Sequence, residues 1–159
     1  MFEQGLTAML SVATDPYLLF LIFVTTILGV VIGVLPGLGA TTGAALLLPF
    51  TLTMDPVHAI AVLATIYVSA TFAGSITAIL INTPGTSAAA ATTFDGYPLA
   101  QKGEAGRALG VAVISSTVGG VFSVIILCFA APLLARVAYE FRSTEYFALT
   151  VFGLSLIHI

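Results

Sequence analysis

Residues 79–98 read ILINTPGTSAAAATTFDGYP, and this stretch begins as an apolar helix that ends inside a long uncharged run. Asn82, Thr83, Pro84 and Gly85 place an amide, a hydroxyl, a helix-breaking ring and a flexible glycine one after another. Unpaired backbone groups are very unfavourable in hydrocarbon, so a helix breaks at membrane depth only inside protein or beside a cavity. The stretch is therefore either an ordinary turn outside a membrane or a broken helix within one.

The composition indicates a chain that is embedded in a lipid bilayer. Of its 159 residues, 59% are hydrophobic and 7% are charged, whereas soluble domains carry about 25% charged residues. Three ranges contain no Asp, Glu, Lys or Arg: 16–54, 56–94 and 108–135. Each is longer than the roughly 20 apolar residues that a spanning helix needs. We therefore predict an all-α integral membrane protein that binds the lipid bilayer and no nucleic acid, because it has no basic cluster.

Two broken or re-entrant helical elements are expected between three transmembrane helices. The expected spans cover residues 17–35, 56–81 and 107–136, and a helix at 40–48 is too short to cross alone. The polar segment 95–106 is expected to form a surface loop, because its Asp-Gly pair is a strong turn signal.

Both breaks combine Pro-Gly with small residues and threonines: PGLGATTGAA begins at Pro36, and PGTSAAAATT begins at Pro84. A half-helix that begins at membrane depth points free N–H groups at a cavity, where transporters bind anions, and unwound carbonyls bind the coupling cation. No Lys or Arg precedes Lys102, so a bound carboxylate would rely on N–H groups, hydroxyls, Asn82 and a co-bound cation. Thr86 and Ser87 would cap the second half-helix. An extramembrane turn capped by Thr and Ser is an equal alternative at this point.

Glycine spacing also predicts close helix packing, which small residues favour in lipid. Gly29, Gly33 and Gly37 recur every four residues. Plain helix contact is the simpler interpretation for Gly29 and Gly33, whereas for Gly37 and Gly39 packing and ligand contact are equally supported. His58, near a helix start, is interpreted as an interface residue rather than a proton relay. No His, Cys, Asp or Glu cluster has metal-ligand spacing, so we expect neither an enzyme nor a resident metal or cofactor.

Three blocks of sequence resemble the large permease subunit of tripartite tricarboxylate transporters, the TctA family. They are GVVIGVLPGLGATTGAALLLPF, ATFAGSITAILINTPGTSAAAATTFDGYPLAQKGEAGRALG and SSTVGGVFS, and the resemblance extends over residues 15–153. One departure is Ala40, where many members have proline, and it puts only the loop conformation in question.

The resemblance implies a multi-pass protein of the bacterial inner membrane that imports tricarboxylates such as citrate, or other small organic carboxylates, with Na⁺ or H⁺ as the coupling ion. It implies two partners, a small four-span membrane subunit and a periplasmic solute-binding protein. Residues 1–159 would form a single membrane domain, the N-terminal fragment of a longer permease. Residues 154–159 have a second interpretation, a non-native tail.

The resemblance also carries signature positions onto this chain. Those at the breaks are expected to contact substrate and cation, with Pro36 and Pro84 as the structural breaks. Asn82 and Thr83 are the candidate Na⁺ contacts. The expected substrate contacts, with Thr41 and Ser87 added from the reasoning above, are Gly37, Gly39, Thr41, Asn82, Thr83, Gly85, Thr86 and Ser87. A further loop motif comprises Asp95, Gly96 and Tyr97.

A second function remains open on the sequence. The chain could be a non-transporting membrane scaffold or assembly subunit whose glycines serve only to pack helices. Substitutions at Gly29 and Gly33 would then be the most damaging, whereas a transporter should be most sensitive at Asn82 and Gly85.

Overall fold

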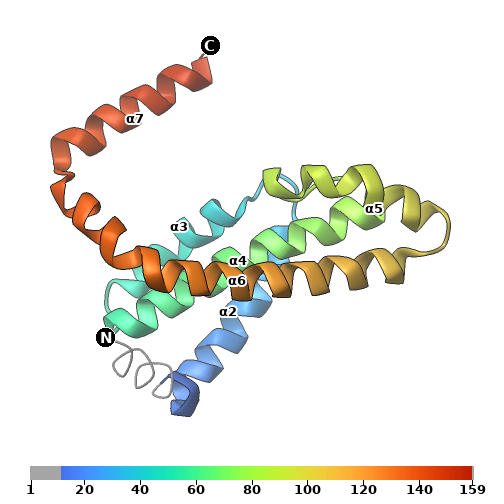
Figure 1. The fold of residues 1–159 in the computed structure, drawn as a ribbon, viewed down its shortest axis with the longest axis horizontal. Coiled ribbons are helices and arrows are strands. Elements are labelled where there is room, and N and C mark those ends of the chain that lie inside the picture. Colours follow the sequence, from blue (N-terminus) through green and yellow to red (C-terminus); the bar gives the residue numbers. More distant parts are fainter. Residues whose placement is uncertain (1–11, 159) are drawn as a thin grey trace. The chain divides into compact units, whose positions relative to one another are not determined.

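The computed structural model describes residues 12–158, and all the regular elements in that range are helices (Figure 1). The chain divides into two compact units, the first ending at Ile114 and the second beginning at Ser115. Three helices in the described range are long and apolar enough to cross a membrane: α2 (Pro16–Val34), α4 (Pro56–Ile81) and α6 (Ala105–Glu140). The predicted all-α membrane fold is confirmed, and the three predicted spans match these helices to within four residues at each end.

Aspartate and proline together begin both α2 and α4. The Asp15 carboxylate accepts hydrogen bonds from the N–H groups of Tyr17 at 2.9 Å and Leu18 at 3.2 Å. Asp55 accepts one from Val57 at 3.0 Å. In each helix the proline takes the first position, where its missing N–H has no intrahelical partner to lose. These local signals explain why both helix starts follow from the sequence.

Helix α4 is the centre of the first unit and contacts α2, α3 (Ala40–Thr51), the 3₁₀ helix η1 (Ser87–Ala91) and α5 (Thr92–Gln101) (Figure 1). Its inward face carries mostly small residues, and its largest fully buried side chains are Ile66 and Ile79. Because small side chains let neighbouring backbones approach closely, one helix can contact four other elements.

Helices α2 and α4 run in the same direction. At their N-terminal ends the side chains of Asp15 and His58 meet. Further along, Gly33 lies against the backbone of Ala70, so closely that a methyl group at Gly33 would collide with the Ala70 carbonyl. A methyl group at Gly29 would likewise collide with the hydroxyl of Ser69. The packing interpretation of Gly29 and Gly33 is therefore confirmed.

Helix α3 returns the chain between these two parallel helices. A methyl group at Gly43 would lie 3.3 Å from the Ile32 side chain and 3.6 Å from that of Ile66, so α3 begins against both neighbours. The predicted end at residue 48 is wrong, because α3 continues through Pro49 to Thr51. A proline so near a C-terminus removes one backbone hydrogen bond without stopping the final turn, in which the Thr51 hydroxyl donates to the Leu48 carbonyl at 2.9 Å.

The predicted loop at Asp95, Gly96 and Tyr97 is wrong, because all three lie inside α5. The glycine allows α5 to approach α4, where a methyl group at Gly96 would lie 2.7 Å from the Ile79 side chain. The turn instead follows α5 at Gly103, whose φ of +82° favours glycine. Tertiary contact thus overrides the local turn preference of Asp-Gly.

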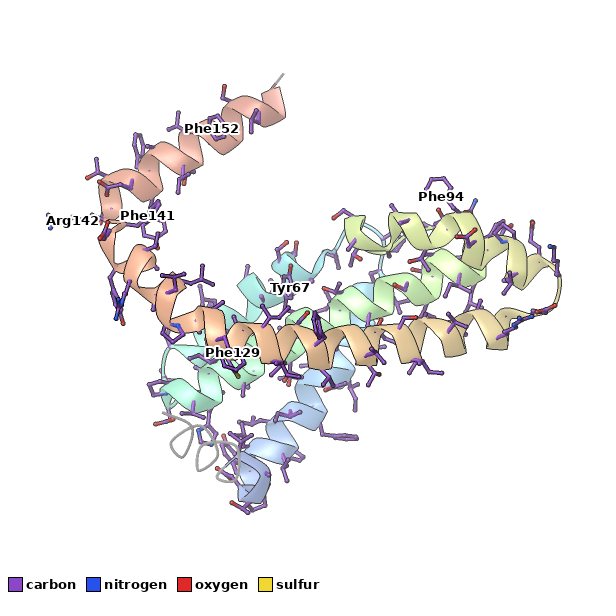
Figure 2. The ribbon with its side chains drawn as sticks, viewed as in Figure 1. Tyr67, Phe94, Phe129, Phe141, Arg142 and Phe152 are labelled. Carbon is purple, nitrogen blue, oxygen red and sulfur yellow. The ribbon has the colours of Figure 1, made fainter. Side chains whose placement is uncertain are left out.

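The second unit consists of the rest of α6, from Ser115 onward, and α7 (Ser143–His158). Its described side chains are almost all exposed, and Phe129 and Phe152 are among the aromatic groups that project from these helices (Figure 2). An apolar outer surface of this kind suits lipid tails or further protein.

We expect Gly33→Ala to lower the free energy of unfolding by about 1–3 kcal/mol, the usual effect of overpacking, because the new methyl group would collide with the Ala70 backbone. The measurement is thermal or denaturant unfolding of the purified chain in lipid nanodiscs. The matched control is Gly110→Ala in α6, where open space surrounds the position. Equal stability of the two variants would show that α2 and α4 do not pack as described.

Candidate functional site

The second break, residues 82–86, turns back from the end of α4 and lies against two helices. The Gly85 N–H donates to the Gly74 carbonyl at 3.3 Å, one of the contacts that return the chain alongside α4. On its other side Gly85 lies so close to the Gly33 carbonyl of α2 that no side chain fits between them. The segment is therefore wedged between the backbones of α2 and α4, a position that requires glycine.

The end of α4 is closed by a left-handed residue. Asn82 has φ of 56° and ψ of 26°, and its N–H donates to the Thr77 carbonyl. Asparagine is among the non-glycine residues that adopt this conformation most readily. The N–H of Thr83 also approaches the Thr77 carbonyl at 3.4 Å, and its hydroxyl donates to the Ile81 carbonyl at 3.3 Å. Asn82 thus has a backbone role, and its side chain is exposed.

Thr86 is the buried polar residue of this break. It is 8% exposed, and its hydroxyl oxygen has no hydrogen-bond partner among the described residues. A methyl group at Gly74 would lie 2.6 Å from that oxygen. Thr86 occupies the N-cap position of η1, but its side chain makes no capping hydrogen bond. The expectation that the Thr86 side chain caps the next helix is therefore wrong. Ser87, by contrast, is exposed.

The first break joins α2 to α3. Leu35 ends α2 by donating its N–H to Ile32, and the Leu38 N–H donates to Leu35 at 3.2 Å. Gly37 has φ of +91°, a left-handed conformation that favours glycine, in open surroundings. Gly39 is the N-cap of α3 and supplies no side-chain cap. The first N–H groups of an α-helix have no intrahelical partner, so the start of α3 differs from the Asp-capped starts of α2 and α4.

The second break meets the end of helix α2, which precedes the first break. Gly33, in the last turn of α2 just before Pro36, contacts Gly85 of the second break. Pro36 is exposed and Pro84 half-buried, and Thr41 lies exposed in the first turn of α3. The structure thus brings together the end of α2 and the residues around Gly85 and Thr86. Asp95, Gly96 and Tyr97 lie further along in α5 and take no part in this contact.

The second break lies between two polar ends of the first unit. Gly74 follows His58 by 16 residues of one helix, about 24 Å at 1.5 Å per residue. Beyond it, α5 runs in the same direction as α4, because Thr86 contacts Gly74 and Gly96 contacts Ile79. The polar connection at Lys102 follows about 15 Å further along. Gly85 and Thr86 therefore lie inside the unit, whereas Asn82 lies at the C-terminal end of α4, 24 residues or about 36 Å along from His58.

Sequence reasoning missed the backbone partners of the break. The glycine spacing predicts helix packing for Gly33 and makes no prediction for Gly74, yet both contact the residues around Gly85. A signal was present: Ala70, Gly74 and Ala78 recur every four residues in α4, a spacing that places small residues on one helical face. It indicates close approach but does not say which segment approaches.

Among residues 12–158, no group of three or more His, Cys, Asp or Glu side chains lies close enough to hold a metal ion.

Comparisons with known proteins agree with the sequence blocks. A family model described as the tripartite tricarboxylate transporter TctA family matches residues 19–159. The chain is also 50% identical over 132 residues to an "Uncharacterized 52.8 kDa protein in TAR-I ttuC' 3'region" of Agrobacterium vitis. That alignment covers 83% of this chain and 26% of the relative, so the chain spans about a quarter of the relative's length. No solved structure matches.

We expect Gly85→Ala to release the break from α2, because a methyl group cannot fit beside the Gly33 carbonyl. Amide hydrogen exchange of the peptide containing residues 82–91 should accelerate about tenfold or more, which corresponds to a loss of about 1.4 kcal/mol. Gly39→Ala is the control, since its methyl group would meet only the Thr41 hydroxyl at an ordinary 3.7 Å. Unchanged exchange in Gly85→Ala would contradict the wedged geometry.

Proposed function

We infer the function of this chain from its family: it belongs to the tripartite tricarboxylate transporter TctA family, whose model matches residues 19–159. We propose that it forms part of the permease of a secondary, cation-coupled transporter in a bacterial inner membrane. The solute would be a tricarboxylate such as citrate or another small organic carboxylate. A small four-span membrane subunit and a periplasmic solute-binding protein would be its partners, in keeping with a transporter of three components.

The observation that carries this proposal is the break wedged between α2 and α4. At Gly85 and Thr86 its backbone is level with Gly74, about 24 Å from His58, and α5 carries the chain about 15 Å further to the polar connection at Lys102. If those polar ends lie at the two membrane surfaces, Gly85 and Thr86 fall within the hydrocarbon layer, which is about 30 Å thick. Non-helical backbone at that depth is tolerated where protein buries it or where it lines a cavity, as in transporters with broken helices.

A carboxylate at this place would be held without a basic side chain, because no Lys or Arg occurs before Lys102. The uncapped start of α3 at Gly39 offers N–H groups and the positive end of a helix dipole. Thr41 lies exposed in that first turn. The Thr86 hydroxyl, buried and without a partner, is the polar atom of the second break that has most to gain from a ligand or ion.

A cation would compensate the charge of the carboxylate. Carbonyl and hydroxyl oxygens are the ligands that such ions prefer, and Asn82 and Thr83 with the carbonyls at the end of α4 supply both kinds. We propose Na⁺ at these residues, with H⁺ as the alternative coupling ion.

The transport proposal predicts opposite effects of Thr86→Val on uptake and on stability. Removing an unpartnered buried hydroxyl should leave the protein as stable or more stable, since such a group is unfavourable by about 1–3 kcal/mol. Uptake of radiolabelled citrate by cells or proteoliposomes with the complete permease should fall at least tenfold. Thr26→Val is the matched control, because the Thr26 hydroxyl faces outward from α2 and bonds the Ile22 carbonyl of its own helix. Full uptake by the Thr86→Val variant would show that Thr86 does not belong to the substrate or ion site.

The scaffold alternative gains support from the packing of Gly29 and Gly33 and makes a different prediction. If the chain only organises other subunits, Asn82→Gly should insert, assemble and support uptake normally, because glycine keeps the left-handed backbone of this position and the exposed side chain is not needed for packing. A transporter permease with a site at the break should lose uptake in this variant while membrane insertion and subunit assembly persist. Uptake and co-purification of the partner subunits, measured on the same membranes, separate the two outcomes.

The choice of coupling ion can be tested on the complete permease. We expect Na⁺ to raise the affinity for radiolabelled citrate at least tenfold over the same concentration of choline, and we expect Thr83→Val to abolish that difference. If the affinity for citrate responds to pH and not to Na⁺, the coupling ion is H⁺ rather than Na⁺.

A further inference from the structure

Two buried oxygen atoms lie where the end of α2 meets the second break, and neither has a hydrogen-bond donor among residues 12–158. One is the hydroxyl oxygen of Thr86. The other is the carbonyl oxygen of Gly33, the last but one residue of α2. A buried acceptor without a donor is unfavourable, so two of them at one contact call for a common partner.

The Pro-Gly pair of the first break explains why the Gly33 carbonyl is unpaired. The last carbonyls of a helix need a donor from outside it or from the residues that follow. Three residues after Gly33 comes Pro36, which has no N–H. The N–H of Gly37, a residue with φ of +91°, makes no bond to Gly33, and the N–H of Leu38 donates to Leu35 at 3.2 Å. The break therefore leaves this acceptor without a backbone donor.

Both oxygens border the same backbone contact. A methyl group at Gly85 would collide with the Gly33 carbonyl oxygen and would lie 3.0 Å from the Cα atom of Gly74. A methyl group at Gly74 would lie 2.6 Å from the Thr86 hydroxyl oxygen. The Gly74 carbonyl is already paired, because it accepts from the Gly85 N–H at 3.3 Å and from the Thr77 hydroxyl at 3.2 Å. The Gly85 Cα–H that points at the Gly33 carbonyl is at best a weak donor.

The chemistry of this pair of oxygens favours a monovalent cation. A carbonyl oxygen can only accept, and the C-terminal end of α2 is the negative end of its dipole, so an anion is disfavoured beside Gly33. Carbonyl oxygens bind monovalent cations in channel filters, whereas proteins hold divalent cations mainly with carboxylates. The ranges 16–54 and 56–94 contain no Asp or Glu. Neutral oxygens in such surroundings suit Na⁺ better than Ca²⁺ or Mg²⁺.

We propose that the Gly33 carbonyl and the Thr86 hydroxyl are two ligands of a monovalent cation that joins the end of α2 to the second break. Water molecules would complete its coordination. The site is separate from the one proposed at Asn82 and Thr83, because Gly74 and Asn82 are eight residues, about 12 Å, apart along α4. It does not rest on the transport proposal, since an ion bound here would stabilise the packed break whether or not a solute is moved.

The test is amide hydrogen exchange of the peptide containing residues 82–91, in the complete permease in lipid nanodiscs. A Thr83→Val background removes the hydroxyl of the other proposed cation site. Replacing choline with Na⁺ should slow the exchange about tenfold once the Na⁺ concentration is about ten times its Kd, because the ion binds only the packed break. Thr86→Val should abolish this response, and Thr86→Ser, which keeps the oxygen, should retain it. Thr26→Val is the matched control and should also retain it.

The part played by the Gly33 carbonyl is tested by Gly85→Ala, which should also lose the Na⁺ response because the new methyl group moves the break away from that carbonyl. A response that persists in Thr86→Val or in Gly85→Ala would place the ion elsewhere and overturn the proposal. Equal exchange in Na⁺ and choline with Thr86 present would overturn it too, and would leave water as the partner of the two oxygens. Neither result touches the transport proposal, which is tested by citrate uptake and affinity.

Discussion

The first unit depends on the contact between the backbones of Gly33, Gly74 and Gly85. In hydrocarbon an extended segment has no water to pair with, so its N–H and carbonyl groups must find partners within the protein. The bond from Gly85 to the Gly74 carbonyl supplies one such partner, and the absence of side chains lets the segment enter between α2 and α4. Any side chain at Gly33 or Gly85 would separate the elements that hold the break in place.

The parallel course of α2 and α4 divides this unit into two ends with different chemistry. At one end Asp15, His58 and Asp55 form a charged cluster where both helices start. Toward the other, small residues bring the helix backbones together and admit the break. Two parallel neighbours need a returning connection, which α3 and its flanking turns provide. The first break is therefore needed to turn the chain from α2 into α3, whether or not it also binds a ligand.

The sequence was most informative where structure depends on neighbouring residues. The uncharged runs predicted three spans, and Pro-Gly predicted both breaks. It failed where distant contacts decide the outcome. Gly96 is a helix residue because Ile79 needs a small neighbour, although Asp-Gly favours a turn. The approach of Gly85 to Gly33 joins residues far apart in the chain, and no local pattern specifies which small-residue faces will meet.

Thr86 bears most directly on whether the break binds anything. A break that served packing alone would be better built with valine or alanine here, because a buried hydroxyl without a partner lowers stability. Packing explains Gly33, Gly74 and Gly85, whose lack of a side chain the contacts require. It gives no reason for an oxygen atom that contacts Gly74 and bonds to nothing described. A hydroxyl that finds its partner only when a solute or ion arrives would account for this oxygen, which is why we favour the proposed transport function over the scaffold.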